Sequence, residues 1–240
     1  MRKFILLLMI VFLGLCSCRF LGKRIHGNGH ITTVEKTVSS FKEVEVRGEN
    51  IKLLVTQGGL TPVKIEGDEN ILSYMEVIQE GDRIVIQPRN GVTLTPSGDL
   101  NVYVSSPEYN SIHASGSSDI IGQNKITSNQ EISLETSGAG NINMELDAPK
   151  VSAGVSGAGS INLKGETKDL SLDISGVGHA YCYGLPTENA TVSISGAGSA
   201  QIYASVKLTV DLSGAGSVNY KGNASVTQEI SGAGSIHKAD

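Results

Sequence analysis

The second half of the chain alternates apolar and polar residues in short runs, and one pattern recurs about every 19 residues. A degenerate Ser115-Gly116-Ser117 comes first, and six copies of Ser-Gly-Ala/Val-Gly follow. Their serines stand at Ser137, Ser156, Ser175, Ser195, Ser213 and Ser231, and the seven motifs are separated by 22, 19, 19, 20, 18 and 18 residues. A period of two is typical of a strand with one buried face. The pattern therefore predicts a repeating β-structure with a glycine turn in every repeat.

Aligning the repeats on this serine separates inward from outward positions. The position seven residues after the serine is mostly apolar, with Met144, Leu163, Cys182 and Ile202 in successive repeats. A single repeat cannot bury such a face alone, whereas a stack of repeats buries a continuous core. We therefore predict a parallel β-solenoid, or β-helix, over residues 108–240, with rungs of about 19 residues. Right-handed and left-handed winding both stay open.

The first half contains short β-type runs without helical periodicity. Turn residues separate these runs, which are Ile31–Val34, Phe41–Val46, Ile51–Thr56, Pro62–Glu66, Tyr74–Gln79, Arg83–Gln87 and Leu100–Val104. We predict an N-terminal β-rich region over residues 31–107 that is continuous with the solenoid. The fold class predicted for the whole chain is all-β.

The N-terminus has the features of a lipoprotein signal peptide. Arg2 and Lys3 precede the apolar run Phe4–Leu15, which is too short to span a bilayer. The run ends in Leu-Cys-Ser-Cys, which resembles a bacterial lipobox with Cys18 as the lipidated residue. We predict a signal peptide over residues 1–17, a membrane anchor at Cys18 and a basic, glycine-rich tether over residues 18–30. An ordinary secretory signal with incidental cysteines is the alternative.

Composition argues against several classes of function. The formal net charge is −5 and no basic stripe is present, so the sequence does not favour nucleic-acid binding. Cys182 is the third and last cysteine, and no disulfide framework or zinc knuckle can be assembled around it. His26 and His30 are separated by glycines, and the serine-glycine motif lacks the lysine of a phosphate-binding loop. We therefore expect no metal and no cofactor.

Several segments together resemble a known bacterial family. They are the lipobox, Phe41–Val46, the run from Val63 to Asn70 and the repeated Ser-Gly-Ala-Gly-Ser. They are similar to the DUF2807 proteins, also called putative auto-transporter adhesin, head GIN domain, which are common as lipoproteins of Bacteroidetes. The resemblance implies a β-helical fold and an envelope location. It carries an adhesin label and supplies no catalytic residues.

Two outward columns favour a ligand-binding surface. Six and eight residues after the serine, amides stand beside tyrosines, and the candidate residues are Asn143, Asn162, Gln201, Asn219, Tyr181, Tyr183 and Tyr203. Amides can bind sugar hydroxyls and tyrosine rings can cover sugar faces, which makes a glycan a candidate ligand. The alternative is a solvated face on which amide ladders stabilise the stack.

Catalysis is not favoured by the same columns. A polysaccharide-acting β-helix enzyme would need clustered Asp, Arg or Lys, but arginine is absent after Arg89. Asp211 and Glu229 lie on adjacent rungs, where two solvated carboxylates are favoured over a shared cation. We name no catalytic residue.

The predicted function is that of a non-catalytic cell-envelope lipoprotein, an adhesin or ligand-binding protein acting through the solenoid surface. The alternatives are a periplasmic structural or envelope-stress protein without a dedicated ligand and, less favoured, a polysaccharide-acting enzyme. Arg19 after Cys18 differs from the Asp of inner-membrane retention signals, and the following residues lack an acidic surface-export run. We therefore expect an outer-membrane lipoprotein, with the periplasmic face favoured over the cell surface, and a glycan or an envelope protein as candidate partner.

Overall fold

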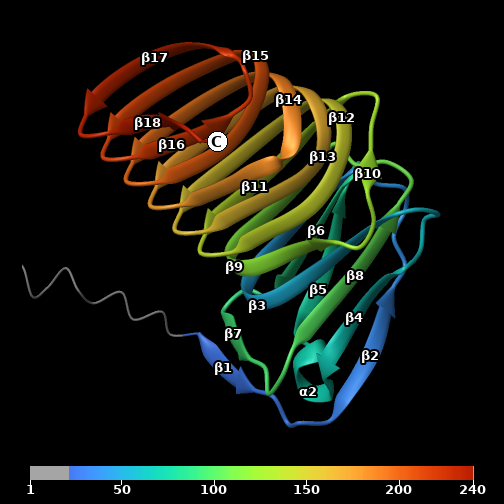
Figure 1. The fold of residues 1–240 in the computed structure, drawn as a ribbon. Helices are drawn as coiled ribbons and strands as arrows, with labels where there is room; N and C mark the ends of the chain where they lie inside the picture. Colours follow the sequence, from blue (N-terminus) through green and yellow to red (C-terminus); the bar gives the residue numbers. More distant parts are fainter. Residues whose placement is uncertain (1–21, 240) are drawn as a thin grey trace, which may run out of the picture.

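The computed structural model describes residues 22–239, which form a β-solenoid joined to a smaller β-rich part (Figure 1). The smaller part contains β1 Lys23–His26, β2 Ile31–Lys36, β3 Glu43–Gln57, β4 Val63–Asp68, α2 Glu69–Leu72, β5 Met75–Glu80, β6 Arg83–Pro88, β7 Val92–Thr95 and β8 Leu100–Ser106. The solenoid contains β9 Ser111–Gly122, β10 Ile126–Thr127, β11 Glu131–Gly138, β12 Asn141–Gly157, β13 Ser160–Gly176, β14 His179–Gly196, β15 Ser199–Gly214, β16 Ser217–Lys221, β17 Ser225–Gly232 and β18 Ser235–Lys238. The predicted all-β class and the stacked parallel rungs are confirmed.

The strands of the solenoid pair in parallel, in the register that the repeat predicts. Ser175 of β13 pairs with Ser156 of β12 and with Ser195 of β14. In the inward column, Met144 pairs with Leu163 and Cys182 pairs with Ile202, and all four side chains are buried. Each rung therefore places its apolar residues on those of the rung before, and the core runs continuously along the stack.

Each of the two glycines in a turn occupies a position where a side chain would clash, but with a different neighbour. Gly176, the first, has φ 113°, and a Cβ there would lie 2.6 Å from the carbonyl oxygen of Gly157 on the previous rung. Gly178, the second, lies so close to the Val155 side chain that a Cβ would overlap it. The turns still bond to each other, because the backbone N–H of Ala197 donates to the Gly176 carbonyl at 2.8 Å. Close turn-on-turn stacking thus requires glycine at both positions.

Strand β3 connects the two parts of the molecule and acts as a rung before the first serine motif. It pairs in parallel with β9, and Gly48 lies opposite Gly116 with φ 140°. The predicted run Ile51–Thr56 and all but the first two residues of Phe41–Val46 belong to this one strand, whose pairing with β9 shifts between Glu49 and Lys52. The solenoid therefore begins earlier than the serine motifs indicate. Helix α2 and strand β7 were not predicted at all.

The segment predicted as a tether is partly a strand that packs on the β-rich part. Residues 23–26 form β1, which pairs in parallel with β7. Beyond this strand, the Gly29 N–H donates to Asp68 Oδ1 at 2.7 Å, and the Glu69 N–H donates to the His30 carbonyl at 2.8 Å. The prediction treated glycine and charge as signs of a free linker, but these glycines allow close contact with the body of the protein. A Cβ on Gly27 would overlap the Asp68 carboxylate.

The predicted signal peptide and Cys18 lie outside the described residues. Within residues 22–239, no helix has the length and apolar character needed to cross a membrane.

Candidate functional site

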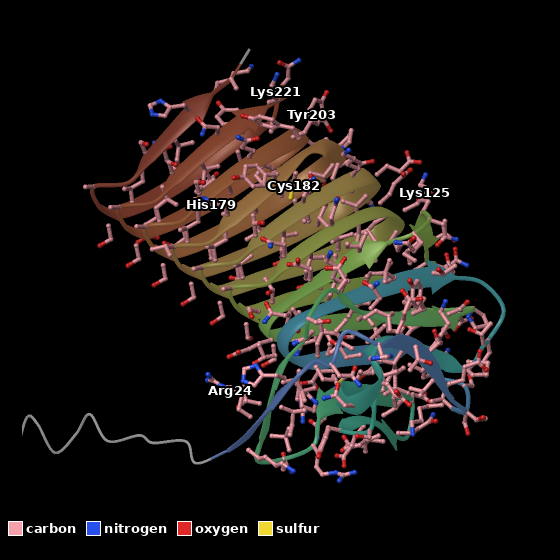
Figure 2. All side chains as sticks on the ribbon, turned by 90° about the horizontal axis from the view of Figure 1, so that it is seen from below. Arg24, Lys125, His179, Cys182, Tyr203 and Lys221 are labelled. Atoms are coloured by element: carbon pink, nitrogen blue, oxygen red, sulfur yellow. The ribbon has the colours of Figure 1, made fainter. Side chains whose placement is uncertain are left out.

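The structure brings the predicted amide and tyrosine side chains onto one side of the solenoid. We call the seven residues Asn143, Asn162, Tyr181, Tyr183, Gln201, Tyr203 and Asn219 the amide–tyrosine face. Five of them form a single column, in which Asn143, Asn162, Tyr181, Gln201 and Asn219 pair in register on successive rungs. Tyr181 is 42% exposed, so its ring is accessible to solvent. Figure 2 labels His179 and Tyr203 on this part of the stack.

The amides of this face are not engaged with one another. Among residues 22–239, no hydrogen bond joins the side chains of Asn143, Asn162, Gln201 and Asn219. The amide ladder suggested as an alternative role is therefore absent. The polar groups instead face solvent, and each amide offers one acceptor and two donors.

Tyr183 does not pair in register with the residues at the same position of neighbouring rungs, because its rung is longer. Ser195 follows Ser175 by 20 residues, one more than in the two preceding rungs. The pairing of β13 with β14 shifts after Asn162, so that Lys164 lies opposite Gly184. The extra residue is absorbed in this bulge. The pairing of β14 with β15 also shifts between Cys182 and Thr187, so Tyr183 and Tyr203 do not form the regular pair that the alignment predicted.

A lysine extends the face toward the C-terminal end of the stack. Lys221 pairs in register with Tyr203, and its Nζ lies 5.3 Å from the centroid of the Tyr183 ring. Tyr203 and Lys221 are neighbours in Figure 2. Burial raises the pKa of the Tyr183 hydroxyl, so this ring stays neutral. At the opposite edge of the face, His179 Nδ1 lies 2.8 Å from Ser199 Oγ.

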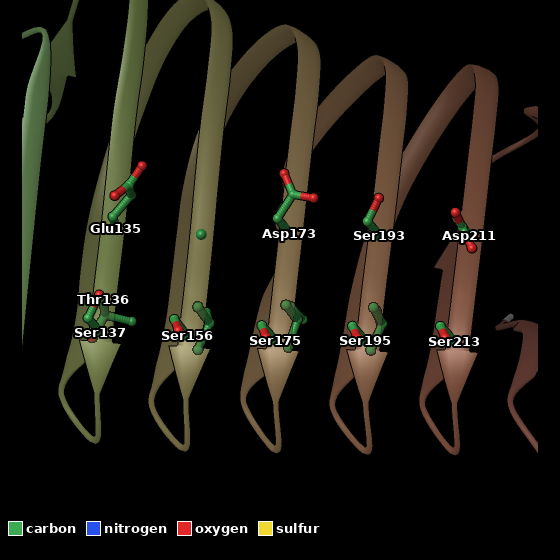
Figure 3. Close-up of a pocket in the computed structure, with 14 residues that line it drawn as sticks. Glu135, Thr136, Ser137, Ser156, Asp173, Ser175, Ser193, Ser195, Asp211 and Ser213 are labelled. Carbon is green, nitrogen blue, oxygen red and sulfur yellow. The ribbon is translucent and has the colours of Figure 1, made fainter.

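A second surface was missed by the sequence analysis. A shallow groove of about 300 Å³ runs across the strands that precede the glycine turns. Figure 3 shows the serines of the repeated motif in one row, with Glu135, Asp173 and Asp211 in a second row. The acids stand on every second rung, separated by Gly154 and Ser193, and these small residues open the groove. This alternation of acidic and small residues is visible in the aligned sequence and could have indicated it.

The groove does not assemble a metal site. Within the described part of the chain, no group of three or more His, Cys, Asp or Glu residues is placed to hold a metal ion. The pair named in the sequence, Asp211 and Glu229, lies opposite in register on β15 and β17. Among residues 22–239, no third acidic or imidazole ligand joins them.

Cys182 is a core residue. Its side chain is fully buried, and burial raises the pKa of the thiol to about 12. A thiol with such a pKa is protonated at neutral pH and is a poor nucleophile.

With this geometry established, comparison with known proteins identifies the family. The family model DUF2807, described as "Putative auto-transporter adhesin, head GIN domain", matches residues 40–224. The chain belongs to the DUF2807 family. The match includes β3, which supports its place as part of the repeat-bearing domain. A comparison with curated proteins finds no match.

Solved structures share the fold of this DUF2807 chain. A putative adhesin from Bacteroides fragilis NCTC 9343 has a TM-score of 0.84 at 23% identity, covering 90% of this chain and 100% of its own. A putative lipid binding protein from Parabacteroides distasonis ATCC 8503 has a TM-score of 0.77 at 24% identity, covering 91% and 100%. A putative adhesin from Parabacteroides merdae ATCC 43184 has a TM-score of 0.71 at 24% identity, also covering 91% and 100%. These comparisons show that the fold is shared.

Proposed function

We propose that this protein is a non-catalytic, lipid-anchored envelope protein that binds a glycan through the amide–tyrosine face. The observation that carries the proposal is the column of amides around Tyr181, which lie in register and form no hydrogen bonds with one another. Unengaged amides in a fixed row can bind successive hydroxyl groups of an extended ligand. A tyrosine ring beside them can cover the apolar face of a sugar at a small cost in side-chain entropy.

The spacing of the solenoid suits a polymeric ligand. Neighbouring strands lie about 4.8 Å apart, and a pyranose ring is close to this length. A glycan chain that runs along the solenoid axis would therefore meet one outward side chain per rung. The family description as an adhesin agrees with recognition of an extended ligand at the cell envelope.

The anchor and location complete the proposal. The lipobox at Cys18 supports attachment to the outer membrane, and the periplasmic face is favoured by the absence of an acidic export run after Cys18. The ordered segment from β1 to β2 packs on the β-rich part, so the lipid would hold that part near the membrane and leave the far end of the solenoid extended (Figure 1).

The first test removes the tyrosines from the face. Tyr181→Ala combined with Tyr183→Ala should abolish retention on a glycan array, because the stacking surface is lost. The melting temperature is measured in parallel. The matched control is Tyr74→Ala combined with Tyr103→Ala, which removes two half-buried tyrosines from the β-rich part. Equal loss of retention in both double variants, or retention by the Tyr181/Tyr183 variant, would overturn the assignment of the face.

The second test concerns the lipid anchor and the side of the outer membrane on which the protein lies. Cys18→Ser should abolish incorporation of radiolabelled palmitate and release the protein from the membrane fraction. Protease treatment of intact cells should leave the wild-type protein intact, together with a periplasmic control. Digestion with survival of the control would place the solenoid outside the cell and contradict the periplasmic assignment.

A further inference from the structure

The charges around the amide–tyrosine face are distributed unevenly. In the two columns of the amide–tyrosine face, six and eight residues after each motif serine from β12 to β18, the described side chains include Lys164 and Lys221 and a single carboxylate, that of Glu145. The strands on the other side of the same turns carry Asp173, Asp211 and Glu229. A chain with a net charge of −5 thus places one carboxylate, that of Glu145, at the β12 end of the proposed binding surface and two lysines further along it.

Lys221 is the cation best placed to meet a ligand. Within residues 22–239 its ammonium group forms no ion pair, and its charge rests over the Tyr183 ring at 5.3 Å. An aromatic ring orients an ammonium group without neutralising its charge. The register of β15 and β16 places Lys221 next to Tyr203, and Gln201 lies opposite Asn219 on the same pair of strands. A cation, two rings and two amides therefore occupy one small area.

The other charged residues at the borders of this area do not pair with Lys221. Lys164 lies opposite Glu145 in register at the far end of the face, so its positive charge is partly offset. Around the corner beyond Tyr203, Asp147 and Glu166 approach Lys125 Nζ at 3.4 Å and 3.8 Å. Glu188 also lines that corner groove. Within residues 22–239 none of these carboxylates forms an ion pair with Lys221, so its ammonium group remains available to a ligand.

From this arrangement we propose that the ligand is an acidic glycan. The carboxylate of a uronic acid unit pairs with Lys221, while the ring of that unit or its neighbour lies against Tyr203 or Tyr183. The hydroxyl groups of the next units along the axis bond to Gln201, Asn219 and Asn162. This inference rests on the proposed function, and it adds the chemical class of the ligand.

The test compares acidic polysaccharides with their neutral counterparts. Full-length protein in a non-ionic detergent is passed over immobilised polygalacturonate, hyaluronate and alginate, each paired with a carboxyl-reduced form that keeps the chain and loses the charge. We expect at least one acidic polymer to bind about tenfold or more tightly than its reduced form, as one well-placed charge contact allows. Raising the salt concentration should weaken this binding and leave weak binding to the reduced form unchanged.

Variants assign the effect to Lys221. Lys221→Gln should lower the affinity for the acidic polymer about tenfold without changing binding to its reduced form, and Lys221→Arg should restore most of the affinity. The matched control is Lys64→Gln, because Lys64 Nζ lies 4.0 Å from the Tyr103 ring centroid in the β-rich part. This control removes the same charge from the same kind of pair, and binding should not change.

The outcomes separate the two proposals. Equal binding of the acidic and reduced polymers that is lost in the Tyr181/Tyr183 double variant would overturn the acidic class and preserve the glycan-binding face. An equal loss of affinity for the acidic polymer in Lys221→Gln and Lys64→Gln would show that binding depends only on the overall charge of the protein. This result would overturn the role of Lys221. Retention of no polymer at all would overturn both proposals.

Discussion

The two parts of the molecule are stabilised by different kinds of contact. In the described residues every ion pair lies between residues 42 and 166, and seven of them involve the β-rich part or its junction with β9. From residue 167 to 239 the solenoid relies on one turn geometry and one set of buried columns, repeated rung by rung. The β-rich part thus depends on contacts that occur once, and the solenoid depends on contacts that recur.

Glu45 illustrates the contacts that occur once. Its buried carboxylate accepts hydrogen bonds from Arg47 Nε at 2.5 Å and Nη2 at 2.9 Å, and His113 Nδ1 of β9 lies 4.0 Å away. The hydrogen bond from Arg47 lowers the pKa of Glu45 against the opposing effect of burial. No repeat supplies a substitute for this cluster at the junction of β3, β6 and β9.

The largest effect is expected from a change inside the repeated turn. Gly176→Ala should lower the free energy of unfolding by about 3 kcal/mol, because a positive φ and a backbone clash act together. Chemical denaturation measures the change. Gly81→Ala is the matched control, since Gly81 has φ 62° with nothing within 4 Å of a Cβ, and it should cost only about 1 kcal/mol. Equal costs at the two glycines would contradict the role assigned to turn stacking.

A smaller loss of stability is expected when the hydrogen bonds of Asp68, which no repeat duplicates, are removed. This carboxylate accepts hydrogen bonds from the Gly29 N–H at 2.7 Å, the Ser97 N–H at 2.9 Å and Ser97 Oγ at 2.6 Å. Asp68→Asn replaces one acceptor oxygen with a donor, and should cost about 2 kcal/mol. Hydrogen exchange should also accelerate in the segment from β1 to Gly29. Unchanged exchange there would show that Asp68 does not hold this segment.

The stability supplied by Asp68 has a defined pH dependence. Burial alone would raise the pKa of Asp68, but the hydrogen bonds from Ser97 and Gly29 outweigh it, so the folded-state pKa lies below the usual value. A lowered folded-state pKa adds stability above the unfolded pKa of about 3.9, and this stability is lost as the pH falls through the folded-state value. The difference between wild type and Asp68→Asn should therefore be constant near neutrality and shrink below about pH 4. A difference that grows with acidification would contradict this sign.

The smallest effect is expected at Cys182, one member of a repeated column. Cys182→Ala removes one buried atom and should cost roughly 1 kcal/mol, similar to deletion of a methyl group. The native thiol, with its pKa raised to about 12, should not react with iodoacetamide at pH 8 until the protein is unfolded. Rapid labelling of the native protein would show that the column opens at this rung.

Prediction from the sequence succeeded where neighbours in space are one repeat apart in the chain. The burial of Met144, Leu163 and Cys182 and the register of Asn143, Asn162 and Tyr181 follow from the alignment of the serines. Prediction failed where partners are unrelated in sequence. The register break at Tyr183 lay between these cases, because the longer rung was visible but the place of the bulge was not.

The sequence by itself determined the approximate rung length, the turn and the inward columns, because a period of two and a nearly constant repeat favour one register over most of each rung. Only the tertiary structure decided that β3 is a further rung, that β1 pairs with β7, and that Asp68 holds Gly29 and Ser97. It also decided that rows of small and acidic residues border a groove and that Lys221 rests over Tyr183. The alternation that borders the groove is visible in the aligned repeats, but the other contacts join segments with no shared pattern, so packing in three dimensions fixes their pairing and leaves no periodic signal in the chain.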